Sequence, residues 1–584
     1  MSLENKLEQK RVQKIFVVCF AIILALLPLT HMFSRTIPYI YNDEFGYWAT
    51  AAHIRGYDWS NVFQNISYYS YGYGVILSVF LFLFQDTGAA YIAAVGLNAV
   101  WLVGSYICLL AIAKRMAPER GILFRAILAF ACTVYSNNVT QSFYTWPENF
   151  LFFLFCLIVY LLYAIREKPT YLKCLLLGIL CAYSYVVHQR TIGIIAAVGI
   201  AMLWFLLTKE ICLYHFLCFA GVFIVGFAVV LAVRGNFISS IWQDGSAANA
   251  NNMAGQVSKL QLLLSVQGIK QLLLSLSGKL FYLICATGFL ILWAVERLLG
   301  SGARGLRNAF REKSLKYTNG MTVFFLAALA ANILVSAIFM LTPVGTVHVV
   351  YGRYNDNLMG PFLLLGFLQL LEKKYSSLRC AVYSVVLLLC ALGVRKSQEW
   401  FALGGHAQVN CAGISRFVTP TDIQVWQLAF LVMVCFCILL ALKEVKFKGT
   451  VLAWLPVAVC AVVWIFVGMD SAMAFQQSFG DWRYAPEDSG ACAEVISDYE
   501  QQSGETVSTV YAVEEKDGDY PQRYIANGIQ FALPEEEVQY ITWDDIPEIA
   551  DEHCVVVTAY REYEIDGLES IYQGSLYEVW VPAT

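Results

Sequence analysis

Tyr41-Asn42-Asp43-Glu44-Phe45-Gly46-Tyr47-Trp48 lies just beyond the first long apolar segment of the chain. The stretch places two adjacent carboxylates among aromatic side chains at the point where the chain leaves a hydrophobic run. Burying a carboxylate is costly, so the pair is either solvated or retained for chemistry. Ionisable groups at the edge of a membrane are the first candidates for a functional site, and Asp43 and Glu44 are therefore the first candidates here.

The composition indicates an α-helical polytopic membrane protein. Of 584 residues, 59% are hydrophobic and 14% are charged, whereas soluble domains carry about 25% charged residues. Basic residues precede an apolar stretch from about Ile15 to Leu29, and no small-residue cleavage site follows before His31. This stretch predicts a first transmembrane helix rather than a cleaved signal. The absence of a basic domain and of finger, basic-zipper or RNP-like patterns argues against a nucleic-acid partner.

The long apolar segments predict about thirteen membrane-spanning helices. Their approximate ranges are 15–33, 88–112, 121–137, 149–165, 173–187, 191–208, 212–233, 280–295, 321–341, 357–372, 378–394, 427–442 and 450–469. The run Val75–Phe84 is too short to cross, because a spanning helix needs about 20 apolar residues. It predicts an interfacial or re-entrant helix within a long first external loop, 34–87. With a cytoplasmic N-terminus, the loops rich in Lys and Arg then all fall on the cytoplasmic side.

The chain changes character after about residue 470. Segment 1–469 is the predicted transmembrane domain, whereas 470–584 is polar and acidic and predicts a small extracytoplasmic α/β domain. Its β-branched runs at 506–513, 538–543, 554–560 and 576–581 predict strands, and 486–497 predicts a helix. Cys492 and Cys554 would face an oxidising side, but the sequence leaves their pairing as a disulfide open.

Unusual polar residues gather on the external side of this topology. They are Asp43, Glu44, Glu148, His188, Arg190, Lys279, His348, Arg353 and Tyr354. A carboxylate can accept a proton from an attacking hydroxyl or amine, and arginine holds phosphate with a bidentate fork. A lipid-linked phosphosugar would bring its phosphate to this surface, while its isoprenoid tail lay in a hydrophobic groove. Nearby aromatics, including Tyr47, suit interface anchoring or sugar stacking.

Each of these signals has a structural alternative. Asp43-Glu44 and Glu148 fit acids in the first turn of a helix, Arg190 fits a side chain that reaches toward lipid headgroups, and Asp356 is expected to cap a helix. Histidines such as His188 and His348 are more often structural than catalytic. Asp43, Glu44 and Glu148 could also supply oxygen ligands to a divalent cation such as Mg²⁺ or Mn²⁺, although their spacing does not require one.

These residues, in this order, resemble the GT-C superfamily of polyprenyl-phosphate-sugar glycosyltransferases. The resemblance is to the family 39-like group of protein O-mannosyltransferases and lipid A aminoarabinose transferases. Asp43-Glu44 with Tyr47 matches the Asp-Glu pair of the first external loop, and Glu148 matches a second acid entering the fourth span. Arg190-Thr191-Ile192-Gly193 and Gly352-Arg353-Tyr354 resemble two later arginine motifs. Thirteen spans and an external C-terminal α/β domain resemble the aminoarabinose transferases.

The resemblance implies an inverting glycosyltransferase that moves a sugar from a polyprenyl-phosphate carrier to an extracytoplasmic acceptor: a cell-envelope glycan, a lipid or a protein. Asp43 would be the general base, and Glu44 would orient it, bind the acceptor or hold a metal. Glu148 would support the acceptor or the sugar. The remaining roles are donor-phosphate binding by Arg190 and Arg353, aided by Lys279 and His348, and substrate binding by Tyr47, His188 and Tyr354.

Two other classes of function remain open from the sequence. The first is a transporter or flippase of lipid-linked saccharides, which would favour charged residues near the bilayer midplane and inverted repeats. The second is a sensor or scaffold with an external ligand domain. All three place the chain in a plasma membrane, which we expect to be bacterial.

Overall fold

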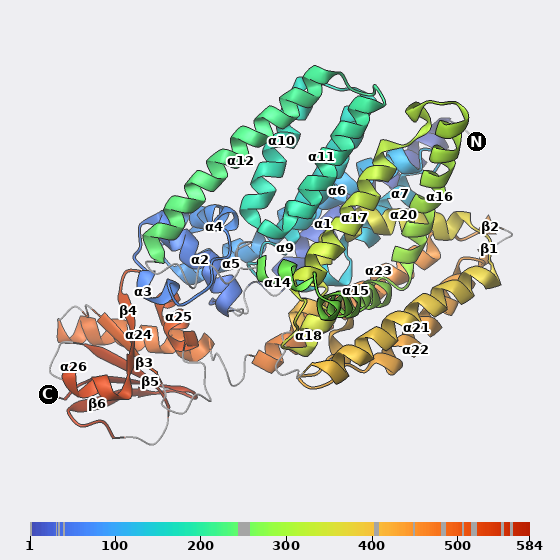
Figure 1. The fold of residues 1–584 in the computed structure, drawn as a ribbon. Helices are drawn as coiled ribbons and strands as arrows, with labels where there is room; N and C mark the ends of the chain where they lie inside the picture. Colours follow the sequence, from blue (N-terminus) through green and yellow to red (C-terminus); the bar gives the residue numbers. More distant parts are fainter. Residues whose placement is uncertain are drawn as a thin grey trace.

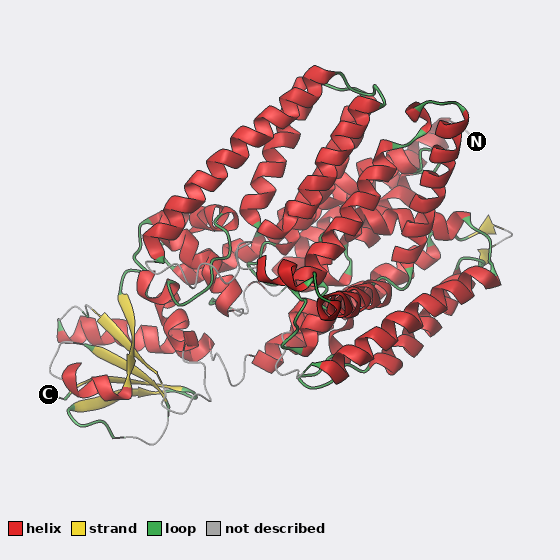
Figure 2. Cartoon of the chain, viewed as in Figure 1, coloured by secondary structure: helices red, strands yellow, loops and turns green. Residues whose placement is uncertain are grey.

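The protein combines a large helical bundle with a smaller C-terminal β-sheet (Figures 1 and 2). The computed structural model describes residues 3–30, 32, 36–38, 41–242, 257–401, 408–447, 450–479, 486–504, 507, 509–514, 523–549, 554–560 and 564–583. The bundle runs from α1 to α23, and the sheet lies beside one end of it, where α2, α3 and α5 meet α25.

The helices of the bundle begin and end as follows: α1 Leu3–Leu29, α2 Tyr41–Arg55, α3 Ser60–Phe63, α4 Gly72–Leu83, α5 Thr87–Gly96, α6 Asn98–Met116, α7 Ile122–Thr133, α8 Ser136–Gln141, α9 Glu148–Glu167, α10 Tyr171–Val187, α11 Ile192–Leu207, α12 Leu213–Ile241, α14 Val257–Leu262, α15 Val266–Ala286, α16 Leu290–Arg311, α17 Gly320–Phe339, α18 Thr346–Val349, α19 Arg353–Asp356, α20 Met359–Glu372, α21 Ser377–Trp400, α22 Val425–Leu442 and α23 Leu455–Phe479. Short 3₁₀ helices η2, η4 and η5 cover Gln189–Thr191, Leu315–Tyr317 and Gln408–Phe417, and the two-residue strands β1 (Lys446–Phe447) and β2 (Thr450–Val451) form a hairpin between α22 and α23.

Ten helical segments of the described chain are long and apolar enough to cross a membrane, which makes this a multi-pass integral membrane protein. Three shorter apolar helices, Ile122–Thr133, Tyr171–Val187 and Met359–Glu372, coincide with predicted spans at 121–137, 173–187 and 357–372. The predicted helical membrane fold is confirmed, whereas the count of thirteen crossings and the direction of insertion stay predictions.

The predicted span 280–295 is wrong in its bounds. The chain forms two helices there, α15 and α16, which are separated where Gly288 (φ 58°) and Phe289 (φ 69°) adopt left-handed backbone conformations. The apolar run hides this break because hydropathy does not report backbone conformation. The segment expected to be a basic loop after residue 295 is instead the rest of α16, which continues to Arg311.

The run Val75–Phe84 is helical, as predicted, and forms α4. This twelve-residue helix packs against α2 in the segment predicted as the first external loop, and Val79 and Phe82 on it are exposed. Close contact requires glycine at position 74, because a Cβ there would lie 2.4 Å from a methyl carbon of Thr50 on α2. The α4 helix therefore supports the helix that carries Asp43.

The C-terminal part contains a five-stranded mixed sheet in the order β4-β3-β5-β7-β6. The strands are β3 Thr509–Glu514, β4 Glu537–Thr542, β5 Val555–Ala559, β6 Leu568–Gln573 and β7 Tyr577–Pro582, and the helices are α24 Pro486–Ser503, α25 Arg523–Ala532 and α26 Ile546–Ile549, with η7 at Trp543–Asp545. β3 pairs in parallel with β4 and β5, whereas β7 is antiparallel to β5 and β6. The four predicted strands are present, but β6 and α25 were not predicted.

Cys492 and Cys554 form no disulfide. Cys492 belongs to the main hydrophobic core, whereas Cys554 packs in a separate cluster with Val556 and Trp580. The thiol of Cys554 donates a hydrogen bond to the carbonyl of Ile549 at 3.2 Å.

The sheet domain is attached to the bundle through Phe531 on α25. Its ring centroid lies 5.3 Å from that of Trp48 on α2 and 6.3 Å from that of Tyr91 on α5. The carbonyl of Phe531 accepts a hydrogen bond from Thr87 at 2.7 Å, and Trp59 donates to the carbonyl of Pro534 at 2.9 Å. The C-terminal domain therefore packs against α2 and stabilises its position.

Candidate active site

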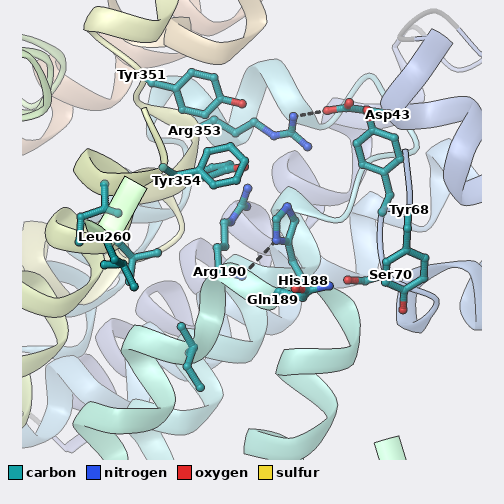
Figure 3. Close-up of a pocket in the computed structure, with 15 residues that line it drawn as sticks. Asp43, Tyr68, Ser70, His188, Gln189, Arg190, Leu260, Tyr351, Arg353 and Tyr354 are labelled. Atoms are coloured by element: carbon teal, nitrogen blue, oxygen red, sulfur yellow. Dashed lines mark hydrogen bonds and ion pairs between the residues drawn. The ribbon is translucent and has the colours of Figure 1, made fainter. Parts of the chain in front are cut away.

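A cavity of about 350 Å³ opens where α2, η2, α14, α17 and α19 come together. Its polar lining includes Asp43, His188, Arg190, Arg353 and Tyr354. Its apolar lining consists of Ile192, Leu260, Val335, Ile338 and Phe339. Figure 3 shows Arg190 and Arg353 extending into the same space, with Asp43 facing Arg353 from the opposite side. The cavity thus combines a polar side with a hydrophobic one.

The charged groups form a chain of alternating sign. Asp43 pairs with Arg353, and Arg353 Nε donates to Glu148 Oε1 at 2.5 Å. The other oxygen of Glu148 accepts from Arg190. Glu148 and both arginines are almost fully buried, whereas the Asp43 side chain is 22% exposed. An acid therefore stands at one end of the chain, and a buried guanidinium stands at the other.

Among the described residues, Arg190 uses only some of its N–H donors in hydrogen bonds. Its Nη2 contacts Glu148, but its Nε and Nη1 are buried and, among the residues that the structure describes, have no hydrogen-bond partner. Leaving a buried charged donor unsatisfied is costly. Arg190 also lines the cavity, so its guanidinium places positive charge beside a space that an anion could occupy.

Local structure explains why these side chains converge. Pro147 directly precedes α9, so Glu148 lies in its first turn, where an acid interacts favourably with the helix dipole. Arg190 lies in η2, a single 3₁₀ turn between α10 and α11, and its backbone N–H donates to Nδ1 of His188 at 3.3 Å. Short connections at one end of the bundle thus place the acid and the arginine side by side.

Aromatic rings support both guanidinium groups. The guanidinium carbon of Arg353 lies 3.6 Å from the ring centroid of Trp146, and that of Arg190 lies 4.8 Å from the ring of Tyr354. Cation–π contacts of this kind stabilise a desolvated cation by about 2 kcal/mol. They also fix the orientation of each fork.

Burial, together with the positive charges of Arg190 and Arg353, lowers the pKa of His188 well below its usual value. His188 is therefore neutral near pH 7, so it can accept the hydrogen bond of Arg190. Burial raises the pKa of Tyr351 to about 12, so its hydroxyl remains a hydrogen-bond donor at the cavity wall.

The structure brings six of the ten predicted site residues together. Asp43, His188, Arg190, Arg353 and Tyr354 line the cavity, and Glu148 lies directly behind the two arginines. Tyr47 is buried one layer back, with its ring centroid 6.0 Å from that of Tyr69.

Glu44 does not line the cavity. It is fully buried, and its Oε1 accepts hydrogen bonds from the backbone N–H and the hydroxyl of Thr145, both at 2.6 Å, and from Tyr91 at 3.0 Å. Glu44 thus connects α2 to the segment that leads into α9.

Lys279 and His348 also lie outside the cavity lining. The Lys279 ammonium donates to the backbone carbonyls of His348 at 2.6 Å and Val349 at 3.2 Å. Burial, with the nearby charges of Lys279 and Lys259, lowers the pKa of His348 to about 4. The Lys279 contacts hold α18 against α15.

Sequence reasoning missed several contributors to the cavity and was wrong about Asp356. Tyr69 donates a hydrogen bond to Asp43, Gln189 lines the wall, and Ser70 takes a positive φ of 78° there. In the sequence, the features that point to these residues are the Tyr68–Tyr73 run and Trp146, which lies two positions before Glu148.

Asp356 is the last residue of α19 and caps no helix. Its carboxylate accepts hydrogen bonds from Tyr135 at 2.9 Å and from Tyr282 at 2.8 Å.

The three carboxylates considered as metal ligands do not converge on one point. Both oxygens of Glu148 are engaged by arginines, and Glu44 binds Thr145 and Tyr91. Among the described residues, no group of three or more His, Cys, Asp or Glu side chains could hold a metal ion. The donor set does not fit a divalent cation held by these three residues.

Comparison with solved structures identifies the fold. The chain resembles ArnT from Cupriavidus metallidurans bound to undecaprenyl phosphate, with a TM-score of 0.54, 12% identity and 97% of each chain covered. The predicted GT-C-like fold is confirmed. The apo form of the same ArnT (TM-score 0.48, 11% identity, 98% of each chain) and the oligosaccharyltransferase AglB from Archaeoglobus fulgidus (0.44, 11%, 94% of this chain and 70% of that chain) also match. No family model and no curated protein matched the sequence.

Proposed function

We propose that the protein is an inverting glycosyltransferase that takes a sugar from a polyprenyl-phosphate carrier. The observation that carries the proposal is Arg190, a buried guanidinium whose Nε and Nη1 have no partner among the described residues and which lines a cavity with Asp43 on its far side. The ArnT structure with a similar fold is bound to undecaprenyl phosphate. A phosphate beside Arg190 would balance the positive charge that this guanidinium places at the cavity wall.

The two sides of the cavity suit the two parts of such a donor. The carrier phosphate would meet Arg190 and the nearby Arg353, because guanidinium binds phosphate through paired N–H donors. The isoprenoid chain would follow the apolar side formed by Leu260, Val335 and Phe339. The sugar would then lie between the arginines and Asp43.

In the proposed reaction the acceptor hydroxyl or amine attacks the anomeric carbon of the sugar. Asp43 takes the proton from the attacking group, the bond from the anomeric carbon to the phosphate oxygen breaks, and polyprenyl phosphate leaves with the electron pair of that bond. Arg190 stabilises the negative charge that develops on this phosphate. Attack on the side opposite the leaving phosphate inverts the configuration.

The other residues would act through these groups. Glu148 holds both arginines in place and, in this proposal, fixes their forks toward the phosphate. His188 and Tyr354 would line the bound sugar phosphate, with Tyr47 supporting them from behind. Glu44, Lys279 and His348 would shape the protein around the cavity rather than touch the substrate.

Enzyme chemistry explains this arrangement better than transport. The charged residues lie at helix ends, in η2, α19 and the first turn of α9, whereas a transporter would hold its substrate on broken helices near the midplane. We further propose that the cavity faces the extracytoplasmic side of a bacterial plasma membrane and serves a glycan, lipid or protein acceptor there.

The test is sugar transfer from radiolabelled polyprenyl-phosphate sugars by the reconstituted protein to cell-envelope glycan, lipid and protein acceptors. Asp43→Asn should lower turnover by about 10²–10⁴-fold while undecaprenyl phosphate still binds, because Arg190 is intact. Wild-type-like turnover in this variant would reject Asp43 as the base. Movement of intact labelled donor across the bilayer, without covalent transfer, would support the transporter instead.

A further inference from the structure

A second cavity, of about 500 Å³, lies at the opposite end of the same helices. The last turns of α17, including Phe339, line the first cavity, whereas Met321 and Thr322 at its start line the second. Helix α9 likewise begins at Glu148 and reaches the second cavity at Arg166. At 1.5 Å per residue these two positions are about 27 Å apart, close to the thickness of a bilayer core.

The lining of the second cavity is strongly basic. Its charged residues are Arg115, Arg166, Arg297, Arg304 and Lys373, with the two acids Glu296 and Glu372, which gives a net charge of +3. These cations come from three helices, α6, α9 and α16, and from the residue that follows α20. Such convergence on one cavity goes beyond the scatter of positive residues expected in loops at one membrane surface.

Two of these cations remain without an acidic partner. Arg297 pairs with Glu372 at 2.7 Å, Arg166 pairs with Glu210 at 2.6 Å, and Arg115 pairs with Glu167 at 2.8 Å. Within the part of the chain that the structure describes, neither Arg304 nor Lys373 forms an ion pair, and both are exposed. The cavity therefore has positive charge available for an anion.

Helix α16 places this charge beside the lipid phase. Leu299, Leu306 and Phe310 are 56%, 50% and 82% exposed, and their spacing of seven and four residues puts them on one face. Arg304 lies about 120–160° around α16 from each of these three residues, on the side of the helix that lines the cavity. An exposed apolar row on one side of a helix and basic residues on the other are typical of a helix that lies in the membrane interface.

We propose that the second cavity binds the phosphate headgroup of an anionic phospholipid, with Arg304 and Lys373 as its main contacts. Paired N–H donors and positive charge suit a phosphate. The amphipathic character of α16 favours a lipid over a free phosphate, because the exposed apolar row would hold the cavity at the depth of the phospholipid headgroups. This site is separate from the proposed sugar transfer, and its occupation would anchor α16 at one membrane surface.

The test is binding of phosphatidylglycerol to the purified full chain in detergent, followed by native mass spectrometry, with phosphatidylcholine as the neutral comparison. The double variant R304Q/K373Q should lower the affinity for phosphatidylglycerol by about tenfold or more. The matched control R307Q/R311Q also removes two positive charges, but at exposed positions of α16 that do not line the cavity. It should change the affinity less than about twofold.

Three outcomes would overturn the proposal. Equal binding of phosphatidylcholine would show that no anion is recognised. An equal loss in R307Q/R311Q would show general surface attraction rather than a site in the cavity. Displacement of the lipid by inorganic phosphate at a similar concentration would show that the ligand is a soluble phosphate. Selective loss in R304Q/K373Q, with resistance to inorganic phosphate, supports the lipid site.

Discussion

Glu44 and Thr145 are joined by two hydrogen bonds, both at 2.6 Å, from the backbone N–H and the hydroxyl of Thr145 to one carboxylate oxygen. Asp43, the preceding residue, instead lines the cavity and pairs with Arg353. Adjacent residues of a helix point about 100° apart, so α2 can present one acid to the cavity and bury the other. The two members of the Asp-Glu pair therefore have different surroundings.

Substitution of Glu44 should affect stability more than chemistry. Glu44→Ala leaves the buried N–H of Thr145 without this acceptor, and we expect the free energy of unfolding to fall by about 2–3 kcal/mol. Turnover per folded molecule should change far less than in Asp43→Asn. Thermal unfolding and transfer measured on the same sample would check this, with Glu44→Gln as a control that keeps an acceptor oxygen. Loss of transfer without loss of stability would instead give Glu44 a role in the chemistry.

Arg190 and Glu148 should behave as a coupled pair. Arg190→Gln leaves one oxygen of a buried carboxylate without its cation, which costs about 3–5 kcal/mol, and removes the proposed phosphate contact. The double variant R190Q/E148Q should regain part of the lost stability but not the binding of undecaprenyl phosphate. A double-mutant cycle on both quantities would measure the coupling. Recovery of binding in the double variant would contradict direct phosphate contact by Arg190.

The neutral state of His188 should appear in the pH dependence of stability. Because the pKa of His188 is lowered in the folded protein, the unfolded chain binds the extra proton first as the pH falls below about 6.5. The contribution of His188 is therefore complete above that pH and is lost on acidification. His188→Asn, which cannot titrate, should flatten the decline in melting temperature between pH 6.5 and 5. An unchanged slope would contradict this assignment.

The donor set of the cavity leads us to expect transfer without an added divalent cation. Glu148 is engaged by two arginines, and Glu44 is turned away from the cavity. Dialysis against EDTA should therefore leave the initial rate of transfer within about twofold, with Mg²⁺ and Mn²⁺ restoring nothing further. A rate that falls with EDTA and returns with either ion would show that Asp43 binds a metal together with the substrate.

The attachment of the C-terminal domain should influence the cavity through α2. Phe531→Ala removes the ring that contacts Trp48 and should cost about 3–5 kcal/mol while lowering transfer. Trp580→Ala is a matched control, because Trp580 is buried in a separate cluster within the sheet. It should destabilise the domain to a similar extent with less effect on turnover per folded molecule. Equal losses of turnover would show a general effect of domain unfolding.

Much of this arrangement could be predicted from sequence because its determinants are local. Long apolar runs specify the membrane helices, and the order of the crossings decides at which end of the bundle the polar residues that flank each run gather. On this basis Asp43, Glu148, Arg190 and Arg353 were placed together correctly. The strands β3, β4, β5 and β7 were predictable from β-branched residues.

The rest depends on tertiary packing. The sequence does not specify that Glu44 turns toward Thr145, or that Lys279 donates to backbone carbonyls, since side-chain direction is fixed by neighbours distant in the chain. The break at Gly288 and Phe289 lies inside an apolar run with no polar marker. Strand β6, Leu568–Gln573, is largely polar because it lies at the edge of the sheet.

The contact between Phe531 and Trp48 also sets an order of events during synthesis. Trp48 emerges early, but the ring that packs against it is made about 480 residues later, which at 5–20 residues per second is roughly 25–100 s. Until then α2 lacks its contact with the C-terminal domain. The surroundings of the cavity are thus completed only after Phe531 has been translated, so a chain truncated before this residue would enter the membrane with its helices but without the contact that holds α2.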